Sequence, residues 1–200
     1  MRWLEARGVV GFYSAGDGGA GAIRPWRNGQ RLTTNMWAFP VTPLGRYATF
    51  EEFEEFGVSD ATALQWWLDL QSFAVNQRTT RLFYNHPPGA RGHLSVVQPF
   101  LTRANSLQAA GKFKFYTMAE LADFSQRRLA TSWTKTTTAG VASFNASNAS
   151  SLSQMTWLLP ITRYNTPAVT AGSATVSSDA QNWVVTATSG AVLRFIAQEK

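Results

Sequence analysis

The sequence predicts an α/β domain followed by an all-β domain. Residues 1–129 alternate short strand-like runs with amphipathic helical segments, whereas residues 130–200 show no helical periodicity. The composition changes at the same place: ten of the twelve acidic residues precede residue 130, and the remainder is dense in Ser, Thr, Ala and Val. Because such a change accompanies a change of architecture, we place a domain boundary between residues 129 and 130.

Four strands are expected in the first domain. Each is a short run rich in β-branched or aromatic side chains, and helical segments separate the runs. They span residues 9–14, 35–41, 81–86 and 112–116. Strands that alternate with helices at this spacing imply a parallel sheet or part of a (β/α) barrel.

Helices are expected between these strands because capping signals mark where they begin. Thr49 and Glu52 have the spacing of a capping box, which predicts a short helix that ends at Gly57. Ser59 is the expected N-cap of a longer helix. The longer helices span about 59–76, about 95–110 and, after a second capping box, about 117–128.

The second domain is predicted to be a small antiparallel β-sandwich. Short apolar runs are separated by Gly, Asn, Ser and Pro, as in domains built of many short strands. The two runs on either side of the pair 189–190, Ser-Gly, predict a hairpin. The Ser- and Asn-rich stretch 143–153 is expected to be an exposed loop. Its two Asn-x-Ser sequences, at Asn145 and Asn148, are interpreted as chance matches to a glycosylation motif.

The charge of the chain does not indicate a nucleic-acid partner. The net charge is +6, but the arginines that supply it are scattered, and the longest run is the pair at 127–128. The absence of Cys excludes disulfides and thiolate metal sites. No apolar run reaches the length of a membrane span, and the first five residues do not have the pattern of a signal peptide.

Of the two histidines, His86 has the position expected of a functional residue. It ends the run 81–86, and Pro87 and Pro88 prevent the strand from continuing because they lack backbone donors. Ligands of α/β folds bind at the carboxyl ends of strands. Because an imidazole ordinarily titrates near neutrality, His86 is the candidate general acid. A structural histidine is the more frequent alternative at such a position.

The loop after the first strand carries Arg24, Trp26 and Asn28, and the second strand carries Trp37 toward the same edge. A glycine-rich stretch, 15–21, precedes these residues, but the helix start that a dinucleotide-binding loop requires does not follow it. Indole rings stack on sugar rings, and guanidinium and amide groups bind hydroxyls and carbonyls. Together with the candidate acid, this set suits a neutral, hydroxyl-rich ligand with a reacting carbonyl.

Five segments of the first domain follow one another in a recognisable order. They are Gly-Phe-Tyr-Ser at 11–14, Arg-Pro-Trp-Arg-Asn-Gly at 24–29, Trp-Ala-Phe-Pro-Val at 37–41, Phe-Tyr-Asn-His-Pro-Pro-Gly at 83–89 and Phe-Tyr-Thr-Met-Ala-Glu-Leu-Ala at 115–122. Over residues 1 to about 128, the series resembles the C-terminal half of the catalytic domain of polysaccharide deacetylases (carbohydrate esterase family four). The resemblance implies a distorted (β/α) barrel, an extracellular or periplasmic location, and metal-assisted removal of acetyl groups from a polysaccharide.

The resemblance also implies roles for individual residues. His86 matches the general acid of the family, and Arg24 matches the arginine that orients the catalytic carboxylate. The polysaccharide is the expected partner. The expected sugar contacts are Trp26, Asn28, Trp37 and Tyr84.

The metal-binding motifs of that family are missing from this chain. They comprise an Asp-Asp pair and a His-x-x-x-His motif, whereas here the two histidines lie seven residues apart around a Pro-Pro-Gly turn. A divalent metal such as zinc therefore belongs to the complete family domain, and none is expected to bind this chain alone. We expect half of an active site, which needs a missing N-terminal half or self-associates through its open sheet edges.

A non-catalytic carbohydrate-binding or structural module is the alternative function. In the second domain, Trp157, Tyr164 and Trp183 could form a sugar-binding face. A place in the core of the domain is the more frequent role of such large aromatic side chains.

Overall fold

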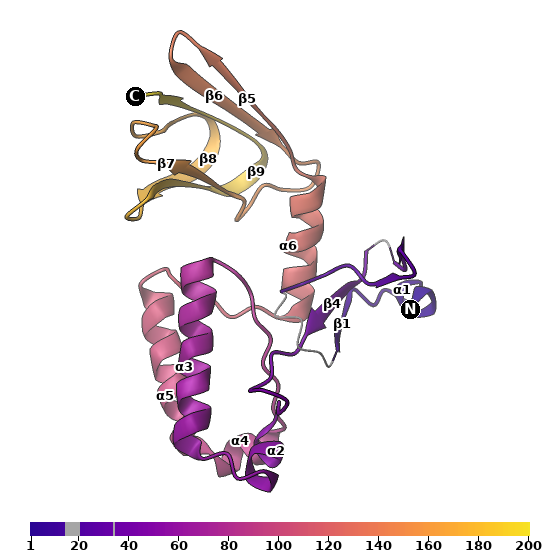
Figure 1. The fold of residues 1–200 in the computed structure, drawn as a ribbon. Helices are drawn as coiled ribbons and strands as arrows, with labels where there is room; N and C mark the ends of the chain where they lie inside the picture. Colours follow the sequence, from indigo (N-terminus) through magenta and orange to yellow (C-terminus); the bar gives the residue numbers. More distant parts are fainter. Residues whose placement is uncertain (15–20, 34) are drawn as a thin grey trace. The chain divides into compact units, whose positions relative to one another are not determined.

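A computed structural model describes residues 1–14, 21–33 and 35–200. The glycine-rich stretch predicted as a loop lies, apart from Gly21, outside the described residues. Close contacts divide the chain into two compact units, residues 1–122 and 123–200, and the division falls within helix α6 (Met118–Ala130) (Figure 1). None of the helices described is long and apolar enough to cross a membrane.

A small parallel layer forms the centre of the first unit. Strands β1 (Gly11–Ser14) and β4 (Trp37–Pro40) pair in parallel, with Tyr13 opposite Phe39. Leu82 extends the layer, because it forms a parallel bridge with Val41. A separate antiparallel hairpin consists of β2 (Trp26–Arg27) and β3 (Gln30–Arg31), and a short helix, α1 (Arg2–Glu5), precedes the layer. The parallel pairing expected of the first two strands is confirmed.

Two of the predicted strands do not form as such. Of the run 81–86, only Leu82 bridges to a neighbour, and the next residue, Phe83, turns into an aromatic cluster, 5.0 Å from the ring of Trp67. The segment 112–116 is not a strand. A strand requires a neighbour to satisfy its backbone groups, and no described segment pairs with this one. The predictions of these two strands are therefore wrong beyond Leu82.

The helices of the first unit are largely those expected from the capping signals. Thr49 and Glu52 form both bonds of a capping box at the start of α2, and the Ser59 side chain accepts the Thr62 amide at the start of α3. An additional helix, α4, begins directly after His86, because prolines are well suited to the first turn of a helix. The helices are α2 (Phe50–Glu55), α3 (Asp60–Gln77), α4 (Pro87–Gly92) and α5 (Leu94–Ala109).

Aromatic packing joins these helices to one face of the layer. Helices α3 and α5 lie side by side (Figure 1). The rings of Trp67 on α3 and Phe100 on α5 are 4.9 Å apart, and Phe83 contacts both. Phe50 on α2 completes this buried cluster. This core cluster of the first unit therefore lies among α2, α3 and α5, with Phe83 packed against it.

The second unit is one antiparallel sheet of five strands, which curls around its core (Figure 1). Strand β9 is central: its first part pairs with β7, its second part with β6, and β8 pairs along its other edge. The expected order of an α/β part followed by an all-β part is thus confirmed. The strands are β5 (Ser132–Thr138), β6 (Val141–Ser147), β7 (Thr156–Pro160), β8 (Ala168–Ser178) and β9 (Asn182–Gln198).

The hairpin predicted at the Ser-Gly pair 189–190 is wrong, because β9 runs through it as one strand. Gly190 has a φ of +86°, a value that glycine adopts without strain. The pair therefore lies where β9 passes from its β7 pairing to its β6 pairing. A local turn signal cannot distinguish a reversal from such a transition.

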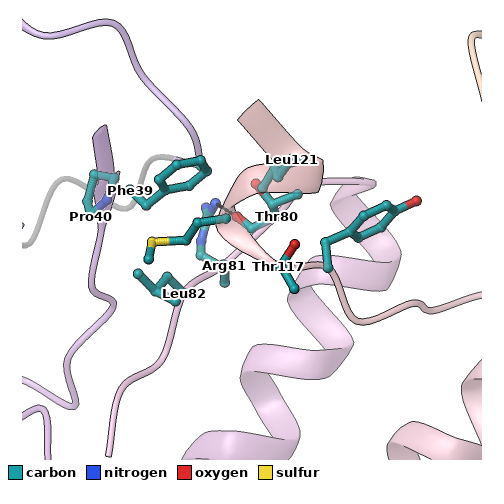
Figure 2. Close-up of a pocket in the computed structure, with 10 residues that line it drawn as sticks. Phe39, Pro40, Thr80, Arg81, Leu82, Thr117 and Leu121 are labelled. Carbon is teal, nitrogen blue, oxygen red and sulfur yellow. Dashed lines mark hydrogen bonds between the residues drawn. The ribbon is translucent and has the colours of Figure 1, made fainter. Parts of the chain in front are cut away.

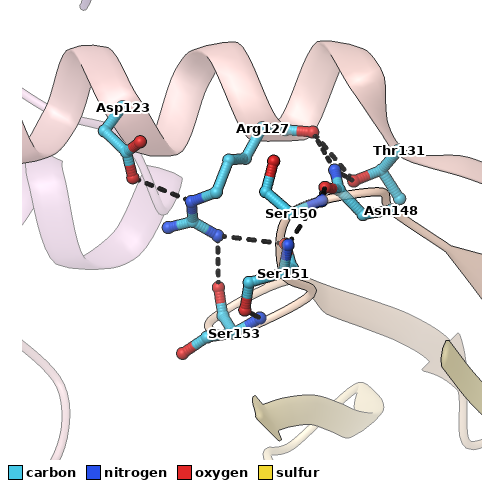
Figure 3. A network of polar contacts seen from close by, with 7 residues as sticks. All are labelled: Asp123, Arg127, Thr131, Asn148, Ser150, Ser151 and Ser153. Carbon is cyan, nitrogen blue, oxygen red and sulfur yellow. Dashed lines mark hydrogen bonds and ion pairs between the residues drawn. The ribbon is translucent and has the colours of Figure 1, made fainter. Parts of the chain in front are cut away.

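The exposed loop predicted over 143–153 is also corrected. Its first residues belong to β6, where Phe144 and Ala146 are buried. Asn148 is 3% exposed, and its side-chain amide donates to the Arg127 carbonyl and the Thr131 hydroxyl (Figure 3). This low-complexity stretch therefore contains the end of strand β6 and the buried, hydrogen-bonded side chain of Asn148, which we call the anchor. The burial of Asn148 agrees with the interpretation of its Asn-x-Ser sequence as a chance match.

Candidate functional site

One face of the parallel layer carries the aromatic side chains of the candidate site. Because side chains alternate along strands, the register places Tyr13, Trp37 and Phe39 on one face, and Tyr84 follows Leu82 on the same face. Trp37 and Phe39 are buried in a cluster with Ala122 of α6. Tyr13, nearer the carboxyl end of β1, is 52% exposed. The carboxyl edge of this face is therefore more open than the rest.

His86 lies in this open region, between an aromatic pair and a carboxylate. The rings of Tyr13 and Tyr84 stack at 5.3 Å, and the ring of His86 meets Tyr84 edge-on at 5.1 Å. Nδ1 of His86 lies 3.3 Å from Oε2 of Glu51, and the His86 side chain is 50% exposed. His86 therefore lies near the exposed end of β1, but not at the end of a strand over 81–86 as predicted, and the sequence analysis did not single out Glu51.

The pKa values of the neighbouring groups follow from these contacts. The backbone amide of Glu51 hydrogen-bonds its carboxylate and lowers the pKa of Glu51, and His86 adds a further lowering. Glu51 is thus held as an anion beside the imidazole. Partial burial raises the pKa of the Tyr84 phenol, and the neighbouring Tyr13 phenol raises it further. Tyr84 accordingly remains neutral and offers an aromatic face and a hydroxyl group.

The segment around His86 packs closely against α2. The Asn85 side chain accepts the Phe50 amide at 3.1 Å, so the residue before His86 caps the helix that carries Glu51. A Cβ atom at Gly89 would lie 2.6 Å from the Glu51 carboxylate, so α4 packs closely against the same group. The Asn-His-Pro-Pro-Gly sequence thus places three residues against one turn of α2.

Arg24 and Trp37 form a second group. The Arg24 guanidinium lies 4.5 Å from the centre of the Trp37 ring. Burial lowers the pKa of Arg24, the charge of Arg31 lowers it further, and Glu5 opposes this. Trp37 is only 4% exposed, so it forms a floor beneath Arg24 and not an open surface for a sugar ring.

Trp26 and Asn28 lie on the β2–β3 hairpin. Asn28 and Gly29 have φ values of +50° and +74°, as the tight turn of a two-residue hairpin requires. Trp26 is 63% exposed. The structure therefore brings Tyr84 to His86 and Arg24 to Trp37, while Trp26 and Asn28 are presented on a separate hairpin.

A hollow of about 340 Å³ lies beside the layer (Figure 2). Phe39, Leu82 and Met118 supply apolar walls, and Arg81 and Thr80 add polar groups. The Arg81 guanidinium donates to the Thr80 carbonyl at 2.7 Å, so its capacity is partly used within the chain. No residue of the sequence-predicted site lines this hollow.

The second histidine has a structural environment. His93 is 9% exposed, its ring stacks on Phe50 at 4.4 Å, and its two ring nitrogens face Asp60 at 2.6 Å and Glu54 at 3.1 Å. The two carboxylates approach opposite edges of the ring and cannot converge on one ion. Within the described ranges, no group of three or more His, Asp or Glu side chains could hold a metal. The donor sets around both histidines therefore do not fit the divalent metal that the resemblance implies.

The aromatic residues singled out in the second unit belong to its core. Tyr164 is 5% exposed, and Trp157 and Trp183 pack against the same buried cluster. The Trp183 indole donates to the Tyr164 carbonyl at 3.0 Å. These contacts agree with the core role and do not present the three rings as a sugar-binding face.

Comparisons of the chain with models of protein families, with curated proteins and with solved structures find no match. Function must therefore be inferred from the chain's own residues and their arrangement.

Proposed function

We propose that this chain is the glycan-binding and proton-donating segment of a polysaccharide deacetylase. The observation that carries the proposal is the position of His86, half exposed at the carboxyl edge of a parallel layer, between Tyr84 and the Glu51 carboxylate. The first unit would be part of a distorted (β/α) barrel, with α3 and α5 on its outer face. The second unit, with one curled sheet in place of the expected β-sandwich, would be an accessory β domain.

His86 is suited to the proton transfer that deacetylation requires. When an acetyl ester or amide is cleaved, the departing sugar oxygen or nitrogen must receive a proton. Glu51 holds Nδ1, which directs Nε2 to the opposite side of the ring. Because the pKa of Glu51 is lowered, its carboxylate is an anion beside the imidazole that would donate the proton.

The remaining residues would bind the glycan. The stacked Tyr13 and Tyr84 offer an aromatic surface next to the imidazole, and Trp26 offers a second one on the hairpin. By the resemblance, Arg24 would orient the catalytic carboxylate. The ligands of the divalent metal used by that family would have to come from outside this chain, and an extracellular or periplasmic location would follow.

A titration of the 200-residue chain with N-acetylated and de-N-acetylated glucosamine hexasaccharides tests the binding part of this proposal. We expect the acetylated sugar to shift the NMR signals of the His86 imidazole and of the Tyr13 and Tyr84 rings. Tyr84→Ala should weaken binding by about tenfold, because it removes an aromatic ring on which a sugar ring would stack. The buried core tyrosine Tyr164 provides signals that should not move. Identical responses to both sugars, or no response to either, would refute the proposal.

Catalysis is tested in a version of the chain that is extended upstream to include a strand with paired aspartates. It should release acetate from acetylated glycans in a metal-dependent way. His86→Gln should lower kcat by about a hundredfold or more with little change in KM. Full activity of the His86→Gln variant would show that the imidazole is not the proton donor.

A further inference from the structure

We propose that the face of the β2–β3 hairpin which carries Trp26 and Arg31 binds the carboxylates of an acidic polysaccharide. The inference rests on the proposed function and adds the charge class of the glycan. A shallow, open hollow lies between α1 and the hairpin, and Arg2 and Arg31 line it from its two sides. Neither arginine is among the candidate site residues expected from the sequence.

The hairpin register places a ring and a charge together. Trp26 is directly opposite Arg31, and Arg27 is directly opposite Gln30. Since directly opposite residues project to the same face, Trp26 and Arg31 share one face and Arg27 lies on the other. Their Cβ atoms are then about 5 Å apart. A sugar ring stacked on the 63%-exposed Trp26 would therefore bring its ring carboxylate within reach of the Arg31 guanidinium.

The charges around this hollow favour an anion. Arg2 and Arg31 are exposed, and neither forms an ion pair with another described residue. Arg31 also lies close enough to Arg24 for the two cations to repel each other. Among the described residues of the lining, Glu5 is the one carboxylate, and its Oε1 accepts the Asn35 amide at 2.6 Å. The local balance is positive, so a bound carboxylate would relieve repulsion between the arginines.

A glycan fits this surface better than a nucleic acid. A phosphate backbone requires cations that continue along its path, and single-stranded binding requires successive aromatic rings. The hairpin pairs one exposed indole with one arginine, and α1 contributes Arg2. The exposed indole of α1, Trp3, is covered by the Arg7 guanidinium, which lies 3.6 Å from the centre of its ring. That arrangement matches one ring with one acidic group. The net charge of +6 on the chain would attract such a polymer from a distance.

Calorimetric titration of the whole chain with trigalacturonate and with its methyl ester tests the inference. The ester keeps the sugar rings and removes their charges. We expect the acid to bind about tenfold more tightly than the ester. Arg31→Gln should lower the affinity for the acid by about tenfold. Arg27→Gln removes the same charge from the opposite face of the hairpin and should change affinity by less than about twofold. Trp26→Ala should weaken binding of both sugars.

Three results would overturn the inference: equal binding of acid and ester, equal effects of Arg27→Gln and Arg31→Gln, or tighter binding of single-stranded DNA than of trigalacturonate at the same salt concentration. Circular dichroism of each variant establishes that it is folded. If trigalacturonate and its methyl ester bind equally while neutral acetylated sugars still shift the NMR signals of His86 and Tyr84, only this inference fails. If neither sugar class binds, the proposed function fails as well.

Discussion

The anchor at Asn148 allows a quantitative prediction for the second unit. The Asn148 amide donates to the Arg127 carbonyl at 2.7 Å and to the Thr131 hydroxyl at 3.0 Å. Its oxygen accepts the amides of Ser150 at 2.8 Å and Ser151 at 3.1 Å. Figure 3 shows this side chain between α6 and the segment that follows β6. Asn148→Ala would remove all four bonds.

The expected loss is smaller than four full hydrogen bonds. Each bond contributes about 1 kcal/mol net. The Arg127 carbonyl still accepts the Thr131 hydroxyl at 2.9 Å, and Ser150 is exposed, so its amide can bond to water. We therefore expect Asn148→Ala to lower the free energy of unfolding of the second unit by about 2 kcal/mol.

Hydrogen exchange of the β9 amides measures this quantity without assuming that the whole chain unfolds in one step. Asn145→Ala is the matched control, because Asn145 is an exposed asparagine three residues earlier, on β6. It should change stability by less than about 0.5 kcal/mol. Equal losses in the two variants would show that the Asn148 bonds do not carry the anchor.

Three further perturbations test other parts of the structure. Gly89→Ala should displace the Glu51 carboxylate and give the His86 imidazole the ¹⁵N chemical shifts found in Glu51→Gln. Gly92 has open space around it, so Gly92→Ala should leave the His86 signals as they are in the wild-type protein. Gly172→Ala should destabilise the second unit by about 2 kcal/mol or more, because its new Cβ would clash with the Val192 carbonyl. Gly190→Ala, at a similar positive φ but without a neighbour, should lose only about 1 kcal/mol in the same hydrogen-exchange measurement. Hydrogen bonds from Ser95 and His93 lower the pKa of Asp60 below 3.8, so its stabilisation is present above that value and is lost as the pH falls through the lower pKa of the folded state. Asp60→Asn should therefore flatten the decline of the urea midpoint on acidification, and an unchanged decline would contradict this assignment.

Sequence reasoning located the helices of the first unit because their signals are local. The bonds of Thr49 with Glu52 and of Ser59 with Thr62 join residues three apart, so a short window contains both partners. Strand pairing has no such window. Leu82 pairs with Val41 across the whole of α2 and α3, and whether residues 112–116 become a strand depends on a neighbour that the local sequence does not reveal.

The same difference between local and long-range signals applies to the candidate site. The two prolines after His86 suggested the end of a strand, whereas only Leu82 of that run bridges to the layer and His86 is the N-cap of α4. Glu51 was missed because it meets His86 from a helix far earlier in the chain, and surface carboxylates are too common for one to be singled out. Its only sequence signal is its place in the first turn after the capping box, where helices commonly carry acidic residues.

Helix α2 contacts both histidines and the segment that joins them. Glu51 and Glu54 lie three residues apart and therefore on one side of the helix, and each meets one of the two histidines that flank α4. Asn85 caps α2 from the segment that leads into α4, and Phe50 stacks on His93 in the aromatic core. The segment that presents His86 is thus fastened at both ends to a single short helix. Since a helix of this length is not stable alone, the position of the imidazole depends on the packing of Phe50 against Trp67, although neither ring lies in the open region around His86.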